Sequence, residues 1–214
     1  MLALSGLAAA LLAALPAPAA AGTETIGRSV EGTPIRAVVR GPQDAGRTVL
    51  VVGTVHGDEQ GGLAVIRELR RRPLPEGLRL VILGQANPDG ARRGTRLNAR
   101  GVDLNRDFGR FRAPESRALA ALIRRERPDV AIHFHQALDL VYRPRGATRT
   151  VVRAYARRVG MRVVASPPYR GTASSYVHRF VPRSTSFVVE LPGGRPPPRV
   201  ATRHARSVLA ARGP

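Results

Sequence analysis

The sequence contains no cysteine, no tryptophan and no lysine, so every one of its 35 basic side chains is an arginine. The absence of cysteine excludes disulfide bonds and thiol-based catalysis. Aromatic residues make up only 4% of the 214 residues, whereas nucleic-acid surfaces usually combine lysine and arginine with interleaved aromatic rings. We therefore expect no specific nucleic-acid partner.

The formal net charge is +20, and the arginines are spread from Arg28 to Arg212. A general coding bias toward arginine and alanine explains this charge as well as a polyanionic partner does. Because a field of this strength attracts acidic polymers at low salt, electrostatic association with an anionic cell wall or membrane surface stays open.

The beginning of the chain has the pattern of a secretory signal. Residues 2–15 are uncharged and apolar, and they are followed by Pro16, Pro18 and small residues in an Ala-x-Ala pattern. The apolar run is too short to cross a bilayer of about 30 Å as a helix. No basic residue precedes it, which leaves an uncleaved anchor or a buried helix as alternatives. We expect residues 1–21 to be a signal peptide, residues 22–214 to form one catalytic domain, and the protein to be exported.

Apolar periodicity predicts alternating strands and helices along the remaining chain. The expected strands are residues 48–54, 78–83, 130–134, 162–165 and 186–191. The expected helices are residues 61–72, 115–127, 150–159 and part of 200–212. Because strands and helices alternate, we expect an α/β fold with a mixed, mostly parallel twisted sheet and helices on both faces.

Two of the predicted strands end close to residues that can bind a metal. His56 and Glu59 follow the first strand, where α/β sheets form ligand crevices, and their spacing allows both to reach one cation. His135 follows the third strand and would complete a set of two histidines and one carboxylate, with an open position for water. His133 is a rival for His135, because residues two apart on a strand face the same way. We expect one Zn²⁺ ion, held by His56, Glu59 and His135.

Two further segments carry candidate catalytic residues. Residues 87–108 read NPDGARRGTRLNARGVDLNRDF and show neither a helical nor a strand period. Polar loops on a rigid scaffold bind anionic substrates, and arginine offers a planar fork that matches a carboxylate. Glu190 is the lone acid of the apolar strand SFVVEL. Burying such a charge costs free energy unless something offsets it, which indicates a functional site.

Together these motifs resemble the zinc carboxypeptidase family, and most closely its compact murein peptide amidase or γ-D-glutamyl-diaminopimelate peptidase branch. The shared pattern consists of His56-Gly-Asp-Glu59, NPDG, Arg96-x-Asn98, Val102-Asp-Leu-Asn-Arg-Asp-Phe108, a strand before His135, and Val-Glu190-Leu-Pro. The resemblance implies a twisted eight-stranded mixed sheet, one catalytic zinc and hydrolysis of an amide bond next to a free carboxylate. It also implies that His56, Glu59 and His135 are the metal ligands.

The resemblance implies roles for the other candidates as well. Glu190 matches the general base that takes a proton from zinc-activated water. Arg96 matches the arginine that polarises the scissile carbonyl, with Arg93 close enough to be an alternative. Asn105 and Arg106 match the pair that holds the terminal carboxylate of the substrate.

One element of the larger digestive members has no firm counterpart. These enzymes carry a tyrosine that caps the substrate, and Tyr176 and His178 are both candidates for its place. The short interval between His135 and Glu190 indicates a reduced specificity region. This supports the amidase-like branch.

We expect a zinc metallocarboxypeptidase that acts on peptidoglycan-type peptides. The alternative is a deacylase of the aspartoacylase or succinylglutamate desuccinylase type, which shares the HxxE and Asn-Arg elements and acts on small N-acyl amino acids. The NPDG turn and the Glu190-Leu-Pro sequence favour the peptidase. A wall-binding module without activity is disfavoured, because all the expected catalytic side chains are present.

Overall fold

The computed structural model describes residues 22–213, so the predicted signal peptide at residues 1–21 lies outside the described residues. Within them, no helix has the length and hydropathy that a membrane span requires. The strands are β1 (Gly22–Arg28), β2 (Pro34–Arg40), β3 (Arg47–Thr54), β4 (Leu78–Gln85), β5 (Val130–Arg143), β6 (Arg162–Ala165) and β7 (Thr185–Pro192). The helices are α1 (Gly62–Arg71), α2 (Pro88–Arg93), the 3-10 turn η1 (Leu104–Arg106), α3 (Pro114–Glu126), α4 (Arg149–Val159), α5 (Ala173–Phe180) and α6 (Pro198–Leu209).

The strands join one sheet in the order β1-β2-β4-β3-β5-β6, and β7 pairs with β5. Strand β3 is parallel to β4 and β5, and β5 is parallel to β6 and β7, whereas β2 is antiparallel to β1 and β4. The predicted mixed, mostly parallel sheet is confirmed. The number of eight strands is wrong for the described part of the chain, whose sheet has seven.

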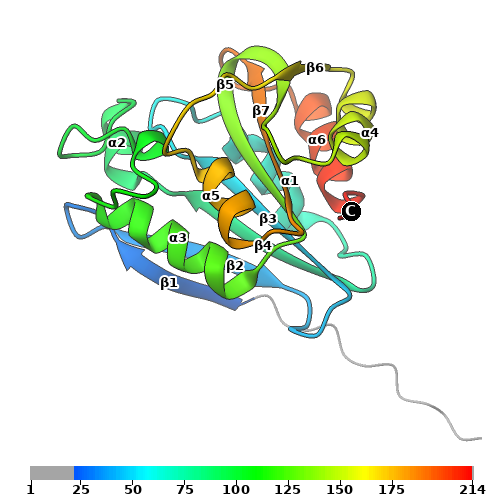
Figure 1. Ribbon diagram of the computed structural model, residues 1–214, viewed down its shortest axis with the longest axis horizontal. Helices are drawn as coiled ribbons and strands as arrows, with labels where there is room; N and C mark the ends of the chain where they lie inside the picture. The colour runs from blue at the N-terminus through cyan, green and yellow to red at the C-terminus, as the bar shows by residue number, and fades with distance from the viewer. Residues whose placement is uncertain (1–21, 214) are drawn as a thin grey trace, which may run out of the picture.

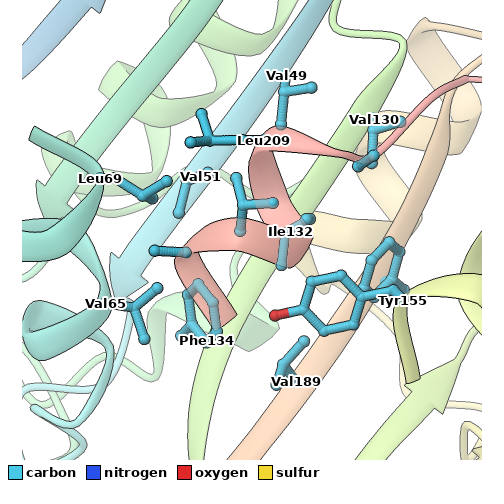
Figure 2. Packing of buried hydrophobic residues seen from close by; sticks show 14 of the residues in the cluster. Val49, Val51, Val65, Leu69, Val130, Ile132, Phe134, Tyr155, Val189 and Leu209 are labelled. Carbon is cyan, nitrogen blue, oxygen red and sulfur yellow. The ribbon is translucent and has the colours of Figure 1, made fainter. Parts of the chain in front are cut away.

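Helices cover both faces of this sheet, as predicted. The buried side chains of α1, α4 and α6 pack on one face, and those of α3 and α5 pack on the other. In Figure 1, α3 and α5 lie in front of the strands. Figure 2 shows the opposite layer, where Val65 and Leu69 of α1 lie over Val51 of β3. Because the middle of β3 is buried on both faces, residues 49–52 form an unbroken apolar run, which made this strand predictable.

The hairpin β1–β2 and the short helices α2 and α5 were not predicted. Both strands of the hairpin contain exposed polar residues, since α3 packs on only one of their faces. Helix α2 is six residues long and depends on caps: the Gly90 amide donates to Asn87 Oδ1 over 3.0 Å, and Gly94 ends the helix with a φ of +64°. A helix this short leaves no detectable period in the sequence.

Strand β5 extends well beyond the predicted end at residue 134. Its pairing with β3 stops at His133, and its pairing with β6 begins at Leu140. His135 therefore lies within β5 and not after its end, which corrects the prediction. It sits where β3 no longer covers the edge of β5, so the space beside it is available to side chains from other elements.

Candidate active site and metal centre

The turn after β3 brings His56 and Glu59 to the carboxyl edge of the sheet. The turn packs tightly on α2, because a Cβ atom added at Gly57 would lie 2.1 Å from the backbone of Gly90. Only glycine allows this approach. As a result the His56 side chain is buried, and its Nδ1 lies 2.9 Å from Glu59 Oε1.

His135 of β5 completes a cluster of three potential metal ligands together with His56 and Glu59 from the turn after β3. Its Nδ1 lies 2.6 Å from Glu59 Oε2 and 3.2 Å from His56 Nδ1. One donor atom from each of the three residues lies within 4.8 Å of the other two. Two imidazole nitrogens and a carboxylate that face one another in this way suit a divalent cation with mixed nitrogen and oxygen ligands, such as Zn²⁺. The residues present therefore fit the metal that the sequence predicted.

His133 takes no part in this cluster. It points to the same face of β5 as His135, but its Nε2 lies 3.2 Å from Ser186 Oγ on the neighbouring strand β7. It is buried, and burial lowers the pKa of its imidazole to about 3. The structure thus separates the two rival histidines by their neighbours.

The charges of the cluster are strongly coupled. Burial opposes ionisation of Glu59, but hydrogen bonds from His135 and His56 outweigh this and lower its pKa to about 2. Burial also lowers the pKa of His135, against the opposing effect of Glu59. For His135 and Glu59 this favours a neutral imidazole beside an ionised carboxylate, the protonation state that metal binding requires. The pKa of His56 is raised instead, because the lowering effect of its burial is outweighed by its contacts with Asp103 and Glu59.

Asp103 contacts the far side of the His56 ring, a role that its sequence did not predict. His56 Nε2 lies 3.1 Å from Asp103 Oδ1, which also accepts a hydrogen bond from the Asn105 amide over 2.9 Å. Despite its burial, contacts with His56 and Arg96 hold the pKa of Asp103 well below its usual range. A carboxylate in this position fixes the ring orientation of a metal-binding histidine. Asp103 lies within the Val102 to Phe108 motif, but its contact with His56, 47 residues earlier, has no local signal in the sequence.

Arg96 bridges the cluster and Asp103. Its guanidinium donates to Asp103 Oδ2 over 3.1 Å and to Glu59 Oε1 over 3.2 Å, while its side chain remains 42% exposed. Arg93, the alternative, points elsewhere and pairs with Glu31. Arg96 is therefore the arginine that lines the cavity.

Glu190 of β7 lies beside His135 in the register of the sheet. Among the described residues, its Oε2 is a buried oxygen with no hydrogen-bond partner. Burial, together with the charge of Glu59, raises the pKa of Glu190 to about 7, against the opposing effects of His56 and Arg96. A carboxyl group that titrates near neutral pH can both accept and return a proton.

Asn105 and Arg106 lie on η1, at the other side of the same cavity. Asn105 Oδ1 accepts a hydrogen bond from the Ala173 amide over 3.0 Å, which leaves the amide NH₂ group as the donor of this side chain. The Arg106 guanidinium stacks 4.2 Å from the ring centre of Tyr169. The cavity has a volume of about 250 Å³ and is lined by all seven predicted site residues: His56, Glu59, Arg96, Asn105, Arg106, His135 and Glu190.

Several known proteins are similar to this chain in sequence or in fold. Residues 45–142 match the succinylglutamate desuccinylase/aspartoacylase catalytic domain family. Murein peptide amidase A of Escherichia coli K12 is 30% identical over 153 residues, which covers 58% of this chain and 63% of the relative. The crystal structure of murein-tripeptide amidase MpaA from Escherichia coli O157 gives a TM-score of 0.68 at 24% identity, over 88% of this chain and 90% of that chain. A metallo-carboxypeptidase from Burkholderia cenocepacia gives a TM-score of 0.73 at 20% identity, over 89% of this chain and 63% of that chain.

The chain is similar in sequence to murein peptide amidase A and has the fold of the metallocarboxypeptidases. It matches 63% of the length of the Escherichia coli murein peptide amidase, which is somewhat less than two thirds. The match to the desuccinylase/aspartoacylase family includes His56, Glu59 and His135 but ends before Glu190. The candidate base therefore lies outside the residues that match this family.

The structure places neither candidate for the capping tyrosine in the cavity. Tyr176 is buried against Phe108 and Phe180, and His178 Nε2 accepts a hydrogen bond from the Ser186 amide over 3.0 Å. The tyrosines that line the cavity are Tyr142 and Tyr169. Tyr169 is 53% exposed at the cavity rim, which sequence reasoning missed because it lies in a loop without a recognisable pattern.

Proposed function

We propose that this protein is a zinc-dependent peptidase that hydrolyses an amide bond next to a free carboxylate, in peptides of the peptidoglycan type. The observation that carries this proposal is the arrangement of the cavity. Three potential metal ligands, a carboxyl group with a raised pKa and two arginines line the same space of about 250 Å³. The homology to murein peptide amidase A supports the peptidoglycan substrate.

The residues divide the chemistry among them. A zinc ion held by His56, Glu59 and His135 would supply a Lewis acid that makes water a stronger nucleophile. Glu190 would accept the proton that the attacking water loses as its oxygen bonds to the carbonyl carbon. The same carboxyl group would return that proton to the leaving nitrogen when the C–N bond breaks.

The arginines would bind the two negatively charged groups of the reaction, which are the developing oxyanion and the free carboxylate of the substrate. Arg96 lies next to Glu59 and can donate to the oxyanion that develops on the scissile carbonyl. Arg106 and the NH₂ group of Asn105 would bind the free carboxylate of the substrate, for which a guanidinium fork is well suited. Tyr169 restricts the movement of Arg106 by stacking on it, which favours a fixed substrate position.

A specific finding favours a second candidate function. The family match over residues 45–142 is to deacylases, which leaves hydrolysis of small N-acyl amino acids as the alternative. The Glu190-Leu-Pro sequence on β7 and the similarity in fold to metallocarboxypeptidases support the peptidase. Both reactions need the same metal ligands, so only the substrate separates them.

The experiment compares the two substrate classes directly. The purified, zinc-loaded protein is incubated with a muropeptide stem tripeptide that ends in diaminopimelate and, in parallel, with N-succinylglutamate and N-acetylaspartate, and release of free amine is measured. We expect turnover of the tripeptide alone, loss of activity with chelator and recovery with Zn²⁺. Preferential turnover of the N-acyl amino acids would overturn the peptidase proposal in favour of the deacylase.

We also propose that the protein acts outside the cytoplasm, where peptidoglycan peptides are found. The signal-like pattern of residues 2–15 is the support for this. Expression of the full chain followed by N-terminal mass analysis of the exported material tests it. A mature protein that begins near Gly22 is expected, and a protein that stays entirely in the cytoplasm would contradict export.

A further inference from the structure

A second hollow lies beside α1 and shares no lining residue with the catalytic cavity. Its volume is about 600 Å³, larger than that of the catalytic cavity. Val38 of β2 and Ile82 of β4 contribute apolar surface from the sheet, and Leu63 and Ile66 contribute it from α1. We call this hollow the α1–β2 groove.

Three arginines line the α1–β2 groove: Arg36 from β2, and Arg67 and Arg70 from α1. All three side chains are exposed. Within residues 22–213, none of them forms an ion pair with a carboxylate, whereas the acids on adjoining segments already have partners. Glu68 of α1 pairs with Arg72, and Glu31 of the β1–β2 turn pairs with Arg92 and Arg93.

Exposed arginines without a carboxylate partner also occur elsewhere among the described residues, and the groove combines three of them with an apolar floor. Arg40, another arginine of β2, has different contacts. Arg40 donates to the backbone carbonyls of Leu69 and Arg72 over 2.7 Å and 2.8 Å, and so caps the end of α1. Arg40 therefore stabilises the fold, while the three groove arginines have their guanidinium donors available to a ligand.

The groove arginines determine what kind of ligand fits. Guanidinium forks bind phosphate and carboxylate oxygens, but a single exposed charge pair contributes little and is screened by salt. A ligand with several linked anionic groups binds more tightly than a single anion, because its weak contacts act together within one molecule. Arg67 and Arg70 are one helical turn apart, which places their Cβ atoms about 5–6 Å from each other. Consecutive phosphates joined by a short carbon linker can match this spacing.

The apolar floor favours a chain with carbon segments between its charges. A lipid bilayer is a poorer fit, because the large exposed apolar side chains of the described residues, Leu97, Leu138, Tyr169 and Phe180, all lie outside the groove lining. We propose that the α1–β2 groove binds a linear polyol phosphate polymer, with phosphodiesters on Arg36, Arg67 and Arg70 and the linker carbons over Val38 and Ile82. This site is separate from the catalytic cavity, and binding there does not require peptidase activity.

The test measures binding of a fluorescent poly(glycerol phosphate) of defined length to the full chain at physiological salt. The groove variant is Arg36→Gln/Arg67→Gln/Arg70→Gln. A matched control, Arg153→Gln/Arg157→Gln/Arg199→Gln, removes the same charge from exposed positions on α4 and α6. We expect the dissociation constant to rise about tenfold or more in the groove variant and to change by less than about threefold in the control.

Equal weakening in both variants would overturn the proposal, because it would mean that the polymer responds only to the overall charge. Thermal unfolding of both variants checks that each is folded. The single reversal Arg67→Glu is a second variant, expected to weaken binding more than Arg67→Gln does. Polyglutamate of equal charge and phosphatidylglycerol vesicles distinguish the ligand classes. Binding of either that is as tight as that of the polyol phosphate, and equally sensitive to the groove variant, would overturn the choice of polymer.

Discussion

Glu59 and Glu190 line the same cavity, yet their surroundings move their pKa values in opposite directions. Both carboxyl groups are largely removed from water, which raises the pKa of each. Glu59 has two imidazole partners, and they lower its pKa to about 2. Glu190 has an oxygen without a partner in the described structure and feels the negative charge of Glu59, so its pKa is raised to about 7.

The difference shows how two residues of one type acquire separate tasks. A carboxylate that stays ionised at every physiological pH is suited to hold a cation. A carboxyl group that titrates near pH 7 is suited to transfer a proton. Glu59 also helps to create the state of Glu190, because its charge is one of the causes of the raised pKa.

The largest expected effect follows from removing the proton acceptor. We predict that Glu190→Gln lowers kcat on the tripeptide by about 10³–10⁴-fold, since general acid–base groups contribute on this scale. Metal content, measured by atomic emission, is expected to stay at the wild-type level because Glu190 is outside the three-residue cluster. Ser166→Ala, which alters the same cavity lining, is the control and should leave kcat nearly unchanged. Retention of kcat within about tenfold would remove Glu190 from the mechanism.

A change of the metal-binding carboxylate is expected to weaken Zn²⁺ binding, which Glu190→Gln leaves intact. We predict that Glu59→Gln raises the dissociation constant for Zn²⁺ by about 10²–10³-fold, more than is typical for groups that only orient a ligand. Competition with a fluorescent chelator measures this affinity, and excess Zn²⁺ should restore part of the activity. If Glu59→Gln binds Zn²⁺ as tightly as the wild type, Glu59 is not a metal ligand, and the division of tasks between Glu59 and Glu190 is wrong.

The parts of this arrangement that the sequence predicted are those with a local signal. Residues 49–52 form an unbroken apolar run because this part of β3 is buried on both faces, and the apolar residues of the helices between strands repeat with the helical period. Helices α2 and α5 are too short to show that period. Strand β5 passes its predicted end because its last residues pair with β6 and β7, and such partners are distant in the sequence.

In the site, too, features with a local sequence signal were predictable and long-range contacts were not. Strand alternation places His133 and His135 on one face and cannot choose between them, whereas Ser186 and Glu59 separate them in space. Asp103 acquires its role from a contact with His56, which lies 47 residues earlier in the chain. Long-range contacts of this kind are created by the fold and leave no mark in the local sequence.

Asp103 is a third carboxylate near the cluster, and it contacts His56. We predict that Asp103→Asn weakens zinc binding or lowers kcat/KM by about 10–100-fold, because His56 loses the carboxylate that orients its ring. Isothermal titration with Zn²⁺ and steady-state kinetics separate these two effects. Asp107→Asn provides a contrast, since Asp107 accepts hydrogen bonds from the Ala113 amide and Ser116 Oγ and should affect stability and not metal binding. An unchanged Zn²⁺ affinity together with unchanged kinetics in Asp103→Asn would show that the contact is not functional.

The smallest expected effect concerns the stability of the metal-free protein. The folded-state pKa of Glu190 is about 7, above the unfolded value of 4.5, so between these pH values the folded state binds more protons. The stability linked to this group is therefore complete below pH 4.5 and is lost as the pH rises through 7. At pH 8 Glu190 is ionised and partly buried, and Glu190→Gln should raise the free energy of unfolding by about 1–2 kcal/mol, after allowance for solvent screening.

Urea unfolding of chelated protein at pH 5 and pH 8 measures this, and the gain should be larger at pH 8. Glu76→Gln removes an exposed carboxylate and serves as the control for the loss of one negative charge. A Glu190→Gln variant that is less stable than the wild type at pH 8 would mean that Glu190 has a stabilising partner. A Glu190→Gln variant that is more stable than the wild type at pH 8 but inactive would show that the unpaired carboxylate lowers the stability of the fold while it serves proton transfer.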